Sequence, residues 1–233
     1  MGSNESPKII LYTSYACPWA HRAQIALKEL DIPFETVHID LSVPRTAEYL
    51  AINPRGLVPS LSYNGTIITE SGIVSQFLAD AHPSHLEKTS NEEGGALQRA
   101  RINFFVDAWF SKVQGFVFPV FKAVAEEKEE LAVKIVDAIV KEIEPLLKDA
   151  NPYFGGATKF TLAEVLTASF VLRVIAFSKY PELLPKSLSA ALEAKAPAFF
   201  KWANLVVTQE SVTYIWDEKK TAERHIERFA AQK

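Results

Sequence analysis

Cysteine is nearly absent from this sequence, which has one among 233 residues, Cys17. A single cysteine excludes a disulfide within the chain, and with it a fold stapled by disulfides. The formal net charge is only −3 and the pI is about 6.0, so the overall charge favours neither nucleic acid nor an anionic membrane as a partner. A long apolar run and a signal-peptide pattern are missing too, so we expect a cytoplasmic protein without a membrane span.

The sequence also lacks metal-ligand spacing, a phosphate-binding glycine loop and a Ser-His-Asp pattern. We therefore expect a site without metal. What the chain does have is 48% hydrophobic and 11% aromatic residues, which is enough for a substantial packed core. Its length allows one large domain or two small ones.

The first third of the chain alternates between strand and helix patterns. The predicted strands cover 8–12, 34–39, 60–63 and 66–69, and the predicted helices cover 18–30, 45–52 and 71–81. Asn64-Gly65 predicts a two-residue hairpin turn between the last two strands. A βαβ unit needs a parallel first pair of strands, and the hairpin adds an antiparallel pair. This order is typical of a thioredoxin-like α/β domain, which we assign to residues 1–82.

Residues 83–95 are polar and rich in helix breakers, so they predict a linker between two domains. From 96 to 233 the pattern is helical throughout, with helices predicted over 96–125, 126–149, 162–178, 198–210 and 218–230. Pro119 is expected to kink or end the first of these. Thr161 and Glu164 form a capping-box pattern at the start of the third. The C-terminal domain is therefore predicted to be all-α.

Cys17 stands between the first predicted strand and the first predicted helix, with Pro18 at the first helical position. At such an N-cap a thiol faces free amide groups and the positive end of the helix dipole, and both favour the thiolate, which is the nucleophile. A buried cysteine that only fills the core is the alternative. Strand, turn, Cys-Pro and helix are the arrangement of thioredoxin-like redox motifs, with Ala20 where a second thiol would stand. A mixed disulfide at Cys17 would then need an outside thiol such as glutathione for its release.

Three motifs resemble the cytosolic glutathione transferases, and the resemblance covers essentially the whole chain. They are Asn53-Pro54-Arg55-Gly56-Leu57-Val58-Pro59, then Glu70-Ser71, and finally Cys17-Pro18-Trp19-Ala20-His21-Arg22, which is similar to the cysteine-type (omega-like) classes. The resemblance implies the glutathione transferase fold, glutathione as co-substrate, a homodimer, and a second-substrate site to which the all-α domain contributes.

It also implies roles for particular residues around glutathione. Val58, before a cis Pro59, would pair its main chain with the cysteinyl backbone of the ligand. Ser71 would bind the γ-glutamyl carboxylate and Glu70 the adjacent ammonium. Arg45 is the candidate partner of the glycine carboxylate.

The remaining polar residues of these motifs have weaker expectations. Arg55 is a poorer candidate than Arg45 for the glycine carboxylate. His21 is expected to be a solvated surface residue, with a role in stabilising the thiolate as the alternative. Arg22 is expected to form a salt bridge that packs the first helix.

Three hypotheses for function follow. The first is an omega-like glutathione transferase in which Cys17 attacks a glutathione mixed disulfide, an S-glutathionyl ketone or dehydroascorbate, and a second glutathione releases it. In the second, the enzyme conjugates glutathione to a small electrophile, and Ser14 or Tyr12 stabilises the glutathione thiolate. In the third, the chain is a non-catalytic glutathione-transferase-like binding module.

Overall fold

The computed structural model describes residues 6–230 and separates into two compact units, Met1–Ser84 and His85–Lys233. The division falls within the predicted linker 83–95. The outer ends of the two predicted domains, residues 1–5 and 231–233, lie outside the described residues. None of the helices among residues 6–230 is both long enough and apolar enough to cross a membrane.

In unit 1, the described residues form one mixed sheet of four strands in the order β2-β1-β3-β4. The strands are β1 Ile9–Thr13, β2 Glu35–His38, β3 Ser60–Tyr63 and β4 Thr66–Thr69. β1 is parallel to β2 and antiparallel to β3, and β3 is antiparallel to β4. Asn64 and Gly65 both have positive φ, 49° and 86°, as a two-residue type I′ turn requires. The predicted turn and strand order are confirmed.

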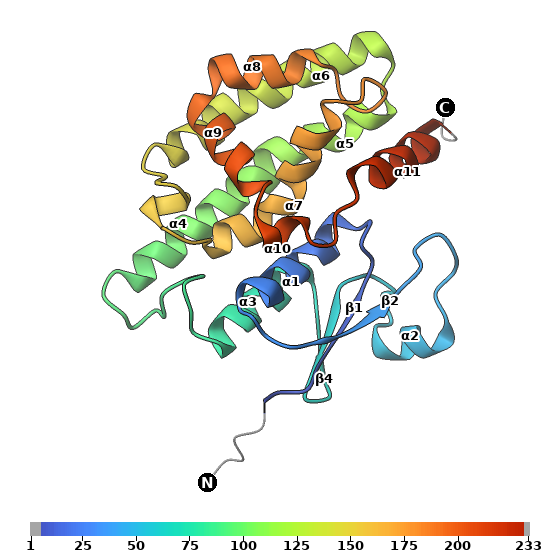
Figure 1. Cartoon of the computed structure of the whole chain (residues 1–233), viewed down its shortest axis with the longest axis vertical. Helices are drawn as coiled ribbons and strands as arrows, with labels where there is room; N and C mark the ends of the chain where they lie inside the picture. The colour runs from blue at the N-terminus through green and yellow to red at the C-terminus, as the bar shows by residue number, and fades with distance from the viewer. Residues whose placement is uncertain (1–5, 231–233) are drawn as a thin grey trace. The chain divides into compact units, whose positions relative to one another are not determined.

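Three helices complete unit 1: α1 Pro18–Glu29, α2 Ala47–Ile52 and α3 Ser71–Ala81. α1 and α3 pack side by side (Figure 1). Their facing positions are apolar and fully buried, as are the central residues of the sheet, and these include Ile25, Val74, Leu78, Leu11 and Leu61. Removing such side chains from water is the main stabilising term of the unit.

The described part of unit 2, residues 85–230, has helices as its regular structure and no strands. Its α-helices are α4 Gly95–Ala108, α5 Gln114–Lys122, α6 Ala125–Ala138, α7 Leu162–Phe177, α8 Ser187–Lys195, α9 Pro197–Val206, α10 Glu210–Thr213 and α11 Glu218–Ala230. Two π-helical turns, η1 Trp109–Val113 and η2 Ile139–Ile143, and two 3₁₀ turns, η3 Glu144–Leu147 and η4 Phe154–Gly156, interrupt them.

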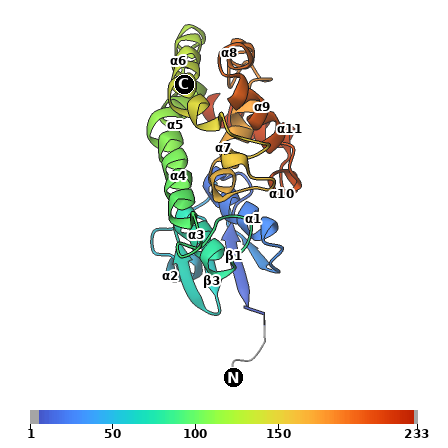
Figure 2. The same ribbon diagram turned by 90° about the vertical axis from the view of Figure 1, so that its left-hand side faces the viewer.

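α7 is the central helix of unit 2 and packs against both α4 and α9 (Figure 2). All of its residues except Ile175 are buried, as expected for a helix that is apolar on every side. The predicted fold class, a thioredoxin-like α/β domain joined to an all-α domain, is therefore confirmed.

The predicted capping box at the start of α7 is also confirmed, and it does more than cap. Glu164 Oε2 accepts hydrogen bonds from the Thr161 amide and hydroxyl, at 2.9 and 2.7 Å. Its Oε1 accepts from the Phe154 amide at 2.7 Å and from Trp202 Nε1 at 2.8 Å. Burial raises the pKa of this carboxyl, and the four donors oppose that effect.

The structure differs from the predicted helices in three details. The predicted helix 96–125 corresponds to α4, η1 and α5, which follow one another without a gap; at the π-turn η1 the buried Trp109 indole donates to Gln114 Oε1 at 3.1 Å, and Pro119 lies inside α5, which ends three residues later. The pattern 126–149 gives way to η2 and η3 before its end. α8 has no counterpart in the prediction.

Candidate functional site

Cys17 occupies the turn between β1 and α1 at the N-cap of the helix, with extended backbone angles and Pro18 at the start of the helix. Its amide donates to the Ser14 carbonyl at 3.0 Å, and its own carbonyl accepts from the His21 amide at 3.1 Å. The thiol is half-buried and, among the described residues, makes no capping hydrogen bond. The predicted N-cap geometry is confirmed, and it places the sulfur near the free amides of the first helical turn.

A cavity of about 380 Å³ opens beside Cys17 within unit 1. Its lining contains all six residues predicted for the site: Cys17, Arg45, Val58, Pro59, Glu70 and Ser71. The other lining residues are Trp19, Leu41, Asn53, Gly56 and Leu57. The fold therefore gathers into one cavity side chains that are up to 54 positions apart, from Cys17 to Ser71.

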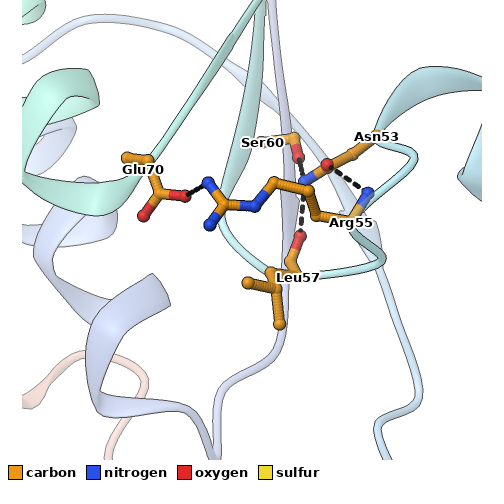
Figure 3. A network of polar contacts seen from close by, with 5 residues as sticks. All are labelled: Asn53, Arg55, Leu57, Ser60 and Glu70. Atoms are coloured by element: carbon orange, nitrogen blue, oxygen red, sulfur yellow. Dashed lines mark hydrogen bonds and ion pairs between the residues drawn. The ribbon is translucent and has the colours of Figure 1, made fainter.

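One wall of this cavity is the segment between α2 and β3. The amide of the buried Asn53 donates to the Leu57 carbonyl at 2.9 Å and to Ser60 Oγ at 3.0 Å, as Figure 3 shows. Tyr49 Oη also donates to the Leu57 carbonyl, and burial raises the pKa of this phenol, so it stays neutral. The Val58–Pro59 peptide bond is cis, as predicted.

Arg45 joins the same wall through hydrogen bonds to the main chain. Its Nε donates to the Gly56 carbonyl at 3.1 Å, and its Nη1 donates to the Asp40 and Val43 carbonyls at 2.8 and 2.6 Å. Gly56 has a φ of +63°, and a Cβ built there would lie 3.1 Å from Arg45 Cγ. Glycine is therefore favoured at this position both by backbone conformation and by the close approach of Arg45.

The opposite wall is the N-terminus of α3. Glu70 is its N-cap and has a φ of 69°, which is uncommon outside glycine. Its carboxylate forms an ion pair with Arg55. Ser71, the first residue of the helix, is buried, and its hydroxyl accepts a hydrogen bond from Arg22 Nη1 at 3.1 Å.

Arg22 was not among the predicted site residues, yet it contacts two residues of the cavity lining. Besides the bond to Ser71, its guanidinium lies 4.7 Å from the centre of the Trp19 ring. Burial lowers the pKa of Arg22 to about 9, so it remains a cation at neutral pH. Trp19 and Arg22 are three residues apart on one helix, and this i, i+3 spacing is the sequence signal for their contact.

Other residues considered from the sequence lie elsewhere. His21 is fully buried, so the expectation of a solvated surface histidine is wrong: α1 buries every residue from Ala20 to Leu27. Within the described chain, Ser14 and Tyr12 are not part of the cavity lining. Ser14 is buried, and Tyr12 packs its ring 5.8 Å from that of Tyr49.

Comparison with known proteins gives matches at the level of family, sequence and fold. Residues 11–89 match the family model described as the N-terminal domain of glutathione S-transferase. Glutathione S-transferase U25 of Arabidopsis thaliana is 29% identical over 206 residues, which is 88% of this chain and 87% of the relative.

Two solved structures have the same fold over nearly the whole chain. Glutathione transferase Omega 1C from Trametes versicolor is 26% identical, with a TM-score of 0.80 over 96% of this chain and 97% of the other. Rice GST1, solved in complex with glutathione, is 21% identical, with a TM-score of 0.83 over 97% and 98%. This chain is therefore similar to glutathione S-transferases in the sequence of its N-terminal part, and similar to them in fold over nearly its whole length.

Proposed function

We propose that the protein is a glutathione transferase of the cysteine-type, omega-like kind, which uses Cys17 to transfer glutathionyl groups. The observation that supports this most is the position of the only cysteine, at the N-cap of α1 and in the wall of a cavity. A hydroxyl-dependent conjugating enzyme would instead need Ser14 or Tyr12 in that wall.

The residues around the cavity suit glutathione, a tripeptide with two carboxylates, one ammonium, a backbone and a thiol. We assign the γ-glutamyl carboxylate to the Ser71 hydroxyl and the first amides of α3, and its ammonium to Glu70. The Val58 main chain pairs with the cysteinyl backbone, with Pro59 as its support. Arg45, held by three carbonyls, supplies the positive charge for the glycine carboxylate.

The reaction then proceeds by two thiol–disulfide exchanges. The Cys17 thiolate attacks the glutathionyl sulfur of a mixed disulfide, the old S–S bond breaks, and the leaving thiolate takes a proton from solvent. A second glutathione thiolate attacks the glutathionyl sulfur now bound to Cys17, which forms oxidised glutathione and restores the Cys17 thiolate. Because the chain has no second cysteine, the second exchange uses glutathione as the external thiol that releases Cys17.

The test is the rate of glutathionyl release from a small mixed disulfide by the wild type, Cys17→Ser and Ser14→Ala. We expect the rate of glutathionyl release to fall about 10³-fold or more in Cys17→Ser, while this variant still binds glutathione. We expect Ser14→Ala to keep the wild-type rate. Full activity in Cys17→Ser would remove Cys17 from the mechanism. Conjugation to an electrophile that survives in Cys17→Ser and is lost in Ser14→Ala would favour the conjugating enzyme. The absence of glutathione binding in calorimetry would favour a binding module.

We also propose a homodimer in the cytoplasm, as the resemblance to the family implies. Light scattering of the purified protein over a tenfold range of concentration tests the assembly. A mass near 52 kDa supports it, since the chain is 26.0 kDa, and a mass near that of one chain contradicts it.

A further inference from the structure

Arg55 and Glu70 form an ion pair at the edge of the glutathione cavity. Arg55 lies in the segment between α2 and β3, and Glu70 precedes α3, so the pair links the two opposite walls (Figure 3). Glu70 lines the cavity, whereas Arg55, among the described residues, is not part of the lining. The Arg55 guanidinium therefore reaches the Glu70 carboxylate from beside the cavity.

Both partners are held in place by their backbones. The Arg55 amide donates to Asn53 Oδ1 at 3.1 Å, and the Gly56 amide donates to the Asn53 carbonyl at 2.8 Å, which fixes the turn that carries Arg55. The Glu70 carbonyl accepts from the Val74 amide at 2.8 Å, which anchors Glu70 at the first turn of α3. The side chains themselves remain largely in solvent, 65% and 47% exposed, so the pair is an exposed one.

The proposed function gives the Glu70 carboxylate a second cation to bind. An α-amino acid head group such as γ-glutamyl brings an ammonium to Glu70, where Arg55 is already bound. Two cations on one carboxylate repel each other at a few ångströms, so the ammonium and the guanidinium compete. An exposed Arg–Glu pair contributes little free energy, and a ligand with further contacts in the cavity can displace it.

We propose that Arg55 is a specificity-determining residue, which occupies Glu70 in the free protein and is replaced there by the ammonium of the incoming γ-glutamyl group. This inference rests on the proposed function. Binding is then an ion exchange at Glu70. A peptide that has the carboxylates but lacks the ammonium leaves the Arg55–Glu70 pair intact and gains nothing when Arg55 is removed.

The experiment measures the calorimetric affinity of glutathione and of N-acetylglutathione, whose amine carries no charge, for the wild type and for Arg55→Gln. We expect Arg55→Gln to bind glutathione about twofold to fivefold more tightly, from the loss of an exposed competing pair. We expect its affinity for N-acetylglutathione to stay unchanged. The gain in glutathione affinity should shrink in 1 M salt, where exposed charges are screened.

A matched control removes one positive charge elsewhere. Lys179→Gln breaks an exposed ion pair with Glu218 in unit 2 and changes the net charge by the same amount. We expect it to leave both affinities unchanged, which separates competition at Glu70 from the general attraction of an anionic peptide.

The outcomes distinguish this inference from the proposed function. If the wild type binds glutathione and Arg55→Gln binds it equally or more weakly, Arg55 does not compete at Glu70 and the inference is overturned alone. A gain for both peptides in Arg55→Gln also overturns it, because the ammonium is then not the competing group. Failure of the wild type to bind glutathione overturns the proposed function and the inference with it.

Discussion

The buried side chain of Arg22, on α1, contacts two residues that line the cavity, Ser71 and Trp19. Its hydrogen bond fixes the rotamer of Ser71, the residue to which we assign the γ-glutamyl carboxylate, and its ring contact orients Trp19. A buried cation next to this hydroxyl also adds positive potential where the carboxylate binds. In the proposed binding mode, Arg22 is therefore a positioning residue for glutathione as well as a packing residue of unit 1.

This role predicts coupling between Arg22 and Ser71. Arg22→Lys keeps the charge but loses the planar guanidinium, so we expect glutathione affinity to fall about threefold to tenfold. In the Ser71→Ala background, the same change should have little further effect, because the hydroxyl that Arg22 orients is gone. Calorimetry on the four proteins, with urea unfolding as the check on folding, measures the coupling. Additive losses would mean that Arg22 acts only through packing.

At the scale of elements, the C-terminal helix α11 is docked on unit 2 by a cluster of aromatic rings around His225. The imidazole lies 5.0 Å from the ring of Phe177 on α7 and 6.2 Å from that of Phe121 on α5, measured between ring centroids. Its Nδ1 is 2.7 Å from the Thr221 carbonyl one turn earlier. Burial is the main cause that lowers the pKa of His225 from 6.5 to about 4; the hydrogen bond to the Thr221 carbonyl opposes this, and the charges of Arg173, Arg228 and Arg224 add to it.

The lowered pKa makes the docking of α11 sensitive to acid. In the unfolded chain His225 binds a proton below about pH 6.5, whereas in the folded protein it does so only near pH 4, so the unfolded state binds more protons in between. The contribution of neutral His225 to the free energy of unfolding is therefore complete above pH 6.5 and is lost as the pH falls towards 4. Between pH 7 and 5 we expect this group to lower the free energy of unfolding by about 2 kcal/mol.

Urea unfolding of the wild type and of His225→Phe at both pH values checks this expectation. The variant keeps an aromatic ring in the cluster. Between pH 7 and 5 its free energy of unfolding should fall by about 2 kcal/mol less than that of the wild type. Other titrating groups, including the buried Glu164, are common to both proteins, so their contributions cancel in the difference. An equal dependence on pH in the two proteins would show that His225 is not the titrating group.

At the scale of the whole molecule, the cavity and all six proposed site residues belong to unit 1. A ligand that binds only the folded protein stabilises it by mass action. At 100 times its dissociation constant, glutathione should add about 2.7 kcal/mol to the transition that unfolds unit 1. Thermal unfolding with and without glutathione measures this, with Ser71→Ala at the same concentration as the control. A shift of equal size in that weakened variant would contradict binding at the cavity.

The sequence predicted unit 1 and its site more closely than unit 2, because the features of unit 1 have local sequence signals and several features of unit 2 do not. Asn64-Gly65 and Pro18 mark a turn and a helix start through local chemistry, so they predict these elements and the position of Cys17. The other cavity residues were predicted by the resemblance of the Asn53–Pro59 and Glu70-Ser71 motifs to the glutathione transferases. The π-turn at Trp109–Val113, where the buried Trp109 indole donates to Gln114, has no turn or breaker residue that would mark it in the sequence. The Arg22–Ser71 and Arg55–Glu70 contacts join residues 49 and 15 positions apart, and only the tertiary fold brings them together.

The solitary thiol at the helix start also sets how this protein responds to peroxide. If an oxidant converts the sulfur of Cys17 to a sulfenic acid, the chain holds no second cysteine with which that group can condense. Two routes remain: capture by an outside thiol, which is reversible, or further oxidation to the sulfinic acid, which glutathione does not reverse. The ratio of free thiol to oxidant in the surrounding solution therefore decides whether the Cys17 thiol is restored or is oxidised irreversibly.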